Sequence, residues 1–294
     1  MQFLRKHVTL LALLLAGILW GIISLFVRQL SAYNLPNAQI VLLRCCISAL
    51  LLGGFLGIRA PKLLRIRLKD LWMFIGTGIF SLFLFNLCYF YVISRGYAAV
   101  GGVLLYTSPA FILLLSALLF KEKFTRRKFT ALLLTLAGCI MVSGLCTQTQ
   151  RIPLKIFVCG IGSGFFYALY SIFSKFAFKR YDSLTITFYT FLFASIASLF
   201  TCNPVTILQF CQAEPRIIPW SIGLAFFCAT LPYILYTWGL MRTSAGRASI
   251  LVAVEPMVCA ILGMCVYGEA HTPLKILGVI CILAAILTLS RSDA

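Results

Sequence analysis

The sequence predicts an all-α polytopic membrane protein with ten transmembrane helices, arranged as two inverted five-helix repeats. Three observations support this fold class. Apolar residues make up 62% of the 294 residues and charged residues only 11%, which is more apolar surface than a soluble domain can bury. The sequence also repeats itself at an offset of 147 residues. Each half has room for five spans, and an odd number of spans turns the second copy over in the membrane.

Ten apolar runs are long enough to be membrane helices, because about 20 helical residues cross a hydrocarbon core of roughly 30 Å. The runs are continuous and lack the alternation of membrane β-strands. They cover approximately residues 8–27, 38–58, 70–94, 98–120, 127–146, 154–176, 184–203, 217–239, 247–267 and 273–291.

The first run follows Arg5 and Lys6, as the apolar core of a signal peptide would. It is longer than an ordinary signal core, and no Ala-x-Ala cleavage pattern follows it. Its counterpart at 154–176 lies inside the chain. We therefore expect the first run to be a membrane helix of the mature protein.

The repeat rests on matching residues in the two halves. Five pairs are identical: Pro109 and Pro256, Glu122 and Glu269, Thr125 and Thr272, Lys128 and Lys275, and Arg95 and Arg242. Near the start of each half, Gly17, Trp20, Ser24 and Arg28 correspond to Gly164, Tyr167, Ser171 and Lys175. We expect two domains, residues 1–147 and 148–294, which join where a polar stretch interrupts the apolar pattern near Thr147–Pro153.

The net charge of +18 would indicate a nucleic-acid partner in a soluble protein, but here the distribution of charge predicts orientation instead. With loops on alternate sides, 18 of the 25 basic residues fall on one side and six on the other. Short basic loops stay in the cytoplasm, so both termini are expected to face the cytoplasm of an inner or plasma membrane. The loop at 121–128 is also far more basic than its counterpart at 268–275, which favours the inversion.

The cysteines and histidines do not predict a metal or cofactor site. Most of the 12 cysteines lie in spans, where a thiol behaves as a small apolar side chain. Cys202 and Cys211 flank the external connection at 204–216 and are able to pair in an oxidising exterior. The chain has two histidines and no Cys-x-x-Cys pair, so we expect no cofactor and no metal.

Glu255 is the only carboxylate deep within a predicted span, and its counterpart in the first half is Ser108. A charge at that depth is costly unless it meets a partner or water. One interpretation is a structural glutamate that holds helices together. The other, which we favour, is a carboxylate that couples transport to protons or binds substrate.

Arg44 is the only basic residue buried deep within a predicted span. From its depth, an Arg44 side chain has the length to approach Glu255 with the help of tilt or water. The alternative is that Arg44 extends to the outer headgroups.

Pro109 and Pro256 interrupt the fourth and ninth spans at matched positions. Proline lacks an amide proton and clashes with the carbonyl four residues earlier. Interrupted helices at matched positions of inverted halves indicate a substrate site, because the freed carbonyl groups need a polar cavity. The alternative is a packed kink without a ligand. Pro232 in the eighth span corresponds to Phe85 and is a weaker signal.

Amphipathic side chains gather in the same spans and are candidates for a cavity wall with hydrogen-bond donors. An aromatic stripe at helical spacing is also common in plain packing. The candidates are Trp20, Asn86, Tyr89, Tyr106, Ser108, Tyr167, Tyr170, Tyr233 and Tyr236. Glu122 and Glu269 recur at helix ends, where we expect each to bind the free amides of the next helix. Thr125 and Thr272 are expected to cap that helix.

These residues carry a resemblance to EamA-type drug/metabolite transporters. The stretch Asn86–Thr125 resembles the signature of the third to fifth spans, through Ser94-Arg95-Gly96, Ser108-Pro109 and Phe120-Lys121-Glu122. Leu240–Thr272 resembles the same signature repeated, through Met241-Arg242-Thr243-Ser244-Ala245, Val254-Glu255-Pro256 and Tyr267-Gly268-Glu269. Arg44 matches the arginine that commonly opens the second-span motif. The resemblance implies ten helices, inverted halves, a central cavity and export of amino acids, other metabolites or drugs.

The sequence thus favours a secondary active transporter that exports small metabolites or amino acids in exchange for protons. The expected partners are the lipid bilayer, a small-molecule substrate and protons, with no nucleic acid. The sequence does not decide whether the protein forms a homodimer. We expect no enzyme activity and assign no catalytic residue, because no span holds a histidine or a nucleophile–base set. An intramembrane enzyme and a non-transporting accessory subunit are the alternatives.

Overall fold

The structure, a computed structural model, describes residues 2–145 and 151–290. The described residues are all-helical and include no β-strand. The join expected at 147/148 lies outside them. The helices of the first half are α1 (Gln2–Gly21), α2 (Ile23–Ala32), α3 (Asn37–Arg59), α4 (Leu71–Ile75), α5 (Leu84–Ile93), α6 (Ala98–Leu105), α7 (Ser108–Phe120) and α8 (Arg126–Val142).

The second half repeats this order with fewer interruptions at its start. Its helices are α9 (Leu154–Ala177), α10 (Ser183–Leu199), α11 (Pro204–Ala213), α12 (Ile217–Ala225), α13 (Leu231–Arg242), α14 (Ala245–Leu251), α15 (Val254–Val266) and α16 (Pro273–Ser290). Two short 3-10 turns, Pro61–Leu64 and Leu68–Asp70, connect α3 to α4.

Eight helical segments of the described chain are long and apolar enough to cross a membrane, or nine if α10 and α11 count as one bent span. The ten predicted runs include α8, whose 17 residues fall short of the roughly 20 that cross a bilayer core. α8 packs closely along α16, because Gly138 and Gly278 face each other: a Cβ on Gly138 would lie 2.8 Å from the Gly278 carbonyl oxygen.

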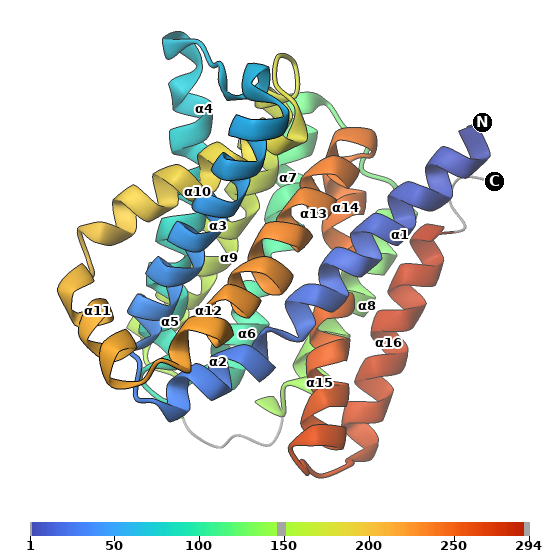
Figure 1. The fold of residues 1–294 in the computed structure, drawn as a ribbon. Helices are drawn as coiled ribbons and strands as arrows, with labels where there is room; N and C mark the ends of the chain where they lie inside the picture. The colour runs from blue at the N-terminus through green and yellow to red at the C-terminus, as the bar shows by residue number, and fades with distance from the viewer. Residues whose placement is uncertain (1, 146–150, 291–294) are drawn as a thin grey trace.

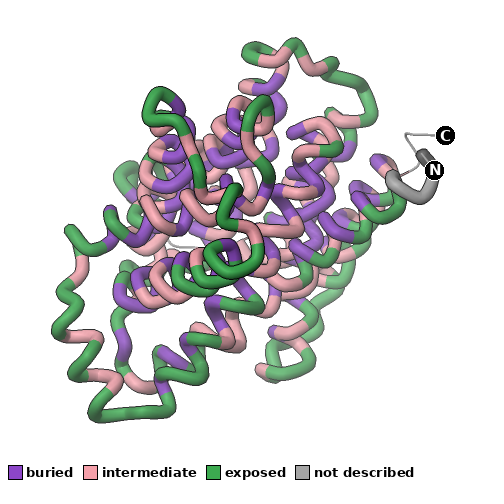
Figure 2. The backbone as a smooth tube through the Cα atoms, turned by 45° about the horizontal axis from the view of Figure 1, so that its top comes forward, coloured by how far each residue is buried: buried purple, intermediate pink, exposed green. Residues whose placement is uncertain are grey.

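Large apolar side chains cover the outside of the bundle, as expected for a surface in contact with lipid. Ile58 is 81% exposed and Phe200 87% exposed, whereas the aromatic ring of Tyr236 is fully buried. Figure 2 shows buried backbone running through the middle of the bundle, with exposed segments at its periphery and in its loops. The protein is therefore a multi-pass membrane protein.

The molecule has two ends, which we name by their loops. The start of α1 and the end of α16 lie at one end (Figure 1), here called the terminal side. The turns at 120–126, 177–182 and 242–245 also lie there. The opposite end, the distal side, holds the turns at 33–37, 94–97 and 267–272.

Two helices are broken at matched positions, and the two broken helices run in opposite directions (Figure 1). The fourth span consists of α6 and α7, which are separated by Tyr106 and Thr107. The ninth consists of α14 and α15, separated by Val252 and Ala253. A proline stands within the first three residues after each break, where a missing amide proton costs no helical hydrogen bond.

The third and eighth spans contain a second matched irregularity that the sequence did not predict. A π-helical segment, η3 (Gly76–Phe83), lies between α4 and α5, and η5 (Phe226–Thr230) lies between α12 and α13. An offset of 147 residues places both at the same point of the repeat. Such π-helical turns loosen the regular ladder and are frequent at functional sites.

The connection predicted at 204–216 is largely the helix α11, bent by 95° from α10. Asn203 caps α11 through Val205 N–H, and Pro204 occupies its first turn. Cys202 and Cys211 are free thiols, so the pairing considered above is absent. A helix between them explains why: nine residues at 1.5 Å rise separate them by roughly 13 Å, beyond disulfide reach.

Candidate functional site

A central cavity of about 540 Å³ lies between the two halves and opens at the distal side. Its deep wall includes Arg44 from α3, Asn86 and Tyr89 from α5, and Glu255 from the start of α15. Its mouth includes Tyr267 and Glu269, and Glu269 is exposed. A cavity of this size, with mostly apolar walls and a few polar groups, suits a small molecule.

Arg44 is a buried cation that the protein leaves partly unsatisfied. Its side chain is only 9% exposed, and its Nη2 donates to Asn86 Oδ1 over a long 3.3 Å. Its Nε has no hydrogen-bond partner. Asn86 is itself fixed, because its amide nitrogen donates to the Leu82 carbonyl. A buried guanidinium with unused donors at a cavity wall is suited to an anionic group such as a carboxylate.

Glu255 is placed by the break in the ninth span. It is the second residue of α15, where unpaired amides and the helix dipole favour negative charge. Tyr106, at the matching break of the fourth span, lies next to its carboxyl group. Cys259, one turn further along α15, also lines the cavity and donates to the Gly21 carbonyl.

The structure brings Arg44 and Glu255 to the same cavity without joining them. No ion pair between the two is present in the described residues. The pairing considered from the sequence is therefore not formed: Asn86 takes the place of the carboxylate as the partner of Arg44. The cavity keeps one cation and one anion available on its walls.

Five of the aromatic candidates form an enclosed cluster on the terminal side of the cavity: Trp20, Tyr167, Tyr170, Tyr233 and Tyr236. They surround a space of about 10 Å³, room for little more than one water molecule. Hydroxyl groups tie the cluster to its neighbours, since Tyr170 pairs with Thr237 at 2.5 Å and Ser171 with Tyr236 at 2.7 Å. This aromatic cluster therefore closes the path towards the terminal side.

Two more candidates lie between the cavity and the cluster. Ser108 and Pro109 line a side pocket of about 10 Å³ together with Tyr106, Tyr167 and Glu255. Of the predicted residues, Arg44, Asn86, Tyr89, Tyr106, Glu255 and Pro256 line the central cavity itself.

Glycines support both helix breaks, a role that residue type alone did not reveal. Gly17 lies against the break of the ninth span, where a Cβ would be 2.6 Å from the Val252 carbonyl oxygen. Its counterpart Gly164 lies against the break of the fourth span, where a Cβ would be 2.9 Å from the Leu104 carbonyl oxygen. Each half therefore contributes a glycine that packs against the helix break of the other half.

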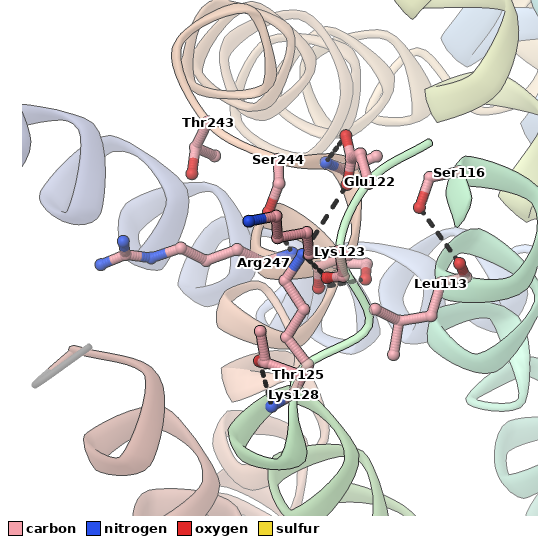
Figure 3. A network of polar contacts seen from close by, with 12 residues as sticks. Leu113, Ser116, Glu122, Lys123, Thr125, Lys128, Thr243, Ser244 and Arg247 are labelled. Atoms are coloured by element: carbon pink, nitrogen blue, oxygen red, sulfur yellow. Dashed lines mark hydrogen bonds and ion pairs between the residues drawn. The ribbon is translucent and has the colours of Figure 1, made fainter. Parts of the chain in front are cut away.

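Glu122 and Glu269 differ from the expectation that each binds the next helix. Thr125 and Thr272 cap those helices, by accepting from Lys128 N–H and Lys275 N–H. Glu122 instead accepts from the amide of Ala245, the first residue of α14 (Figure 3). Glu269 pairs with Lys275 at 2.6 Å. The position of Glu122 at a helix end does not by itself predict a hydrogen bond to the other half of the chain.

A second polar contact holds the terminal side together. Asp70 is 2% exposed and accepts hydrogen bonds of 2.7 Å from Arg180 Nη1 and from the Tyr181 hydroxyl. Burial first, and then the contact with Asp70, raise the pKa of the Tyr181 hydroxyl, so it stays a donor. The loop before α4 is thereby fixed to the turn after α9.

Comparison with known proteins gives a consistent picture. A sequence profile described as the EamA-like transporter family matches residues 7–144 and again residues 154–291. An uncharacterized transporter from Archaeoglobus fulgidus is 29% identical over 276 residues, which cover 94% of each chain. A Pseudomonas aeruginosa protein named pseudopaline exporter CntI is 26% identical over 293 residues, which cover 98% of each chain.

A solved crystal structure has the same fold, with a TM-score of 0.79 over 95% of each chain at 17% sequence identity. The likeness to that structure concerns the arrangement of the helices, since identity at this level carries no information about the cargo.

Proposed function

Because the chain belongs to the EamA-like transporter family, we propose that it is a secondary active transporter that exports small zwitterionic metabolites, amino acids among them, in exchange for protons. Two of its relatives are named as transporters, one of them as an exporter. The observation that carries the proposal is the central cavity, whose walls hold Arg44, with no partner at its Nε, and Glu255, with no ion-pair partner in the described residues.

The cavity favours a substrate that carries both charges. A carboxylate would accept from the unused Nε of Arg44 and from Nη2, while an ammonium group would pair with Glu255. The side chains of Phe85, Tyr89 and Tyr106 supply apolar walls for the rest of the molecule. Glu255 would repel an anion that has no amino group. Arg44 and Glu255 together therefore favour zwitterions over simple acids.

Glu255 is also the proposed coupling group. It lines the open cavity and has no cation within ion-pair distance in the described residues, so a proton and a substrate ammonium compete for the same carboxyl group. Binding of one then releases the other. This competition exchanges substrate for protons without a second, separate proton-binding site.

The arrangement in the membrane follows from the repeat. We assign residues 1–147 and 148–294 to two inverted five-helix repeats, ten spans in all, with α8 and the α10–α11 pair as the remaining spans. The opposite directions of the two broken helices support the inversion. The basic loops on the terminal side support a cytoplasmic position for both termini in an inner or plasma membrane, which makes the central cavity open to the exterior.

The substrate class is tested by thermal unfolding of the purified protein with a panel of α-amino acids as probes. A ligand that binds the folded state raises the unfolding midpoint. For the most effective amino acid, the methyl ester lacks the carboxylate and the deaminated acid lacks the ammonium group. We expect the zwitterion to stabilise the protein and both analogues to lose that effect.

Two variants assign the effect to the cavity. Arg44→Gln and Glu255→Gln should each abolish stabilisation by the zwitterion, whereas Arg216→Gln on the exposed distal surface should preserve it. Equal stabilisation by the ester and the zwitterion would exclude the role of Arg44. No shift with any amino acid would exclude the proposed substrate class.

A further inference from the structure

The two halves present Glu122 and Glu269 on the same backbone turn. α7 ends before Lys121 (φ 55°) and α15 ends before Gly268 (φ 67°), both left-handed and 147 residues apart. The next amide in each half returns to the helix, Glu122 N–H to the Ser116 carbonyl and Glu269 N–H to the Gly263 carbonyl. Ser116 and Gly263 are again 147 residues apart. The backbone is therefore matched while the carboxylates have different partners.

On the terminal side the carboxylate connects the two halves. Glu122 Oε1 accepts from Ala245 N–H at 3.0 Å, and Lys128 and Lys175 approach to 3.9 Å. The side chain is only 15% exposed. Figure 3 shows Glu122 directed at the turn that begins α14, next to Ser244. This contact joins the end of α7 to the start of α14 and closes the terminal side.

On the distal side the equivalent contact is not made. Glu269 is 52% exposed and pairs with Lys275, the counterpart of Lys128. The counterpart of Ala245 is Ala98, the first residue of α6, and both Ala98 and Glu269 line the open mouth of the central cavity. Tyr97 gives α6 no side-chain cap, whereas Ser244 caps α14. The start of α6 therefore has amides for which the helix itself provides no acceptor.

We propose that Glu122 and Glu269 are alternating gate residues. In the described state Glu122 holds α14 and Lys275 holds Glu269. When the cavity exposes its other side, Glu269 leaves Lys275 and accepts from Ala98 N–H, and Glu122 leaves Ala245 and pairs with Lys128. The proposal rests on the inverted repeats and the alternating exposure of the proposed function. It adds the residues that close each side.

The proposal also identifies the region of the terminal side that opens when Glu122 releases α14. Residues of the open cavity have counterparts 147 residues later in the enclosed region: Ser24 with Ser171, Asn86 with Tyr233, Tyr89 with Tyr236, and Phe90 with Thr237. Two hydrogen bonds hold this region closed, one between Ser171 and Tyr236 and one between Thr237 and Tyr170. Release of Glu122 turns this closed region into the vestibule of the terminal side, lined by tyrosine, serine and threonine.

The native thiol of Cys259 can report the exchange without an engineered cysteine. It lines the open cavity, and its counterpart Ile112 is fully buried. When the halves exchange roles, Cys259 takes the environment of Ile112 and loses access to water. We would label the purified full-length protein with a charged methanethiosulfonate and measure the rate at Cys259 by peptide mass spectrometry, which separates it from the other cysteines.

The variants should act in opposite directions. Loss of a charge-assisted hydrogen bond in Glu122→Ala is expected to lower the labelling rate of Cys259 about tenfold. Lys275→Ala, at an exposed ion pair, should lower the rate as well, because it frees Glu269 to close the mouth. Adding Glu269→Ala to either variant should restore the rate. Glu214→Ala, a matched loss of an exposed carboxylate, should leave it unchanged.

Two results would overturn the proposal. One is an unchanged rate in both Glu122→Ala and Lys275→Ala. The other is a double variant with Glu269→Ala that labels as slowly as the single variant. Lys275→Ala keeps the test valid if Glu122→Ala fails to fold, since Lys275 touches no part of the closed side. Labelling reports conformation alone. If the proposed substrate or coupling ion is wrong, the transport assay fails while these labelling rates stay as expected.

Discussion

At the scale of single residues, the cavity keeps two opposite charges apart. Arg44 is held by Asn86 and Glu255 by the start of α15, so neither neutralises the other. Under the proposed function, a bound zwitterion would supply an oppositely charged partner to each. The conservative change Arg44→Lys keeps the charge but loses the planar fork. In the thermal unfolding assay, it should retain part of the stabilisation by an amino acid, and retention of the full effect would show that charge alone matters.

Close packing at the helix breaks makes a second prediction at this scale. A Cβ at Gly17 would lie 2.5 Å from Val254 Cγ1 and 2.6 Å from the Val252 carbonyl oxygen, whereas a Cβ at Gly57 meets nothing within 4 Å. Gly17→Ala should destabilise the protein by about 1–3 kcal/mol, the usual effect of overpacking. Gly57→Ala is the control and should be at least as stable as the wild type, because alanine favours the helix over glycine. Equal unfolding midpoints for the two variants would contradict this view of the break.

Single residues were predictable where chemistry restricts them. A lone carboxylate and a lone guanidinium in apolar spans indicated the cavity, and the structure places Arg44 and Glu255 there. The division of the tyrosines was not predictable. Tyr89 lines the open cavity and its counterpart Tyr236 is fully buried, because one conformation opens only one side of a repeated structure. Residue type and spacing are the same for both.

At the scale of elements, the fourth and ninth spans are each broken into two helices at matched positions. Residues 106–107 and 252–253 separate α6 from α7 and α14 from α15, and the prolines that follow stop either helix from becoming continuous. In Pro109→Ala and Pro256→Ala the break is able to close into a regular helix. We expect insertion and folding to persist while amino-acid exchange slows, measured in proteoliposomes. Exchange at the wild-type rate in both variants would make the prolines packing kinks.

Elements were predictable to the extent that hydropathy and proline define them. The apolar runs correspond to helices, and proline marked the breaks of the fourth and ninth spans. The π-helical segments η3 and η5 have no such marker, since the extra residue in a turn depends on packing between helices. The helix α11 was read as a loop, because Asn203 and Pro204 end the preceding apolar run, and the same two residues begin the helix.

At the scale of the whole molecule, inversion and orientation are tested by reporter fusions. Loops with excess lysine and arginine stay in the cytoplasm, so we expect cytoplasmic signals at residues 64, 123, 180 and 293. External signals are expected near residues 33, 150 and 212. Residues 150 and 293 lie outside the described part of the structure, and the fusions test them directly. External signals at both 123 and 293 would contradict the inverted arrangement.

Exchange of a zwitterion for protons through one cavity is the central claim, and uptake into proteoliposomes under an imposed proton gradient tests it. The probe is the radiolabelled amino acid that best stabilises the purified protein. The wild type should accumulate it above equilibrium, and Glu255→Gln should lose accumulation, because glutamine keeps the shape of the side chain and carries no exchangeable charge. Accumulation by Glu255→Gln at the wild-type level and with the wild-type pH dependence would contradict the account.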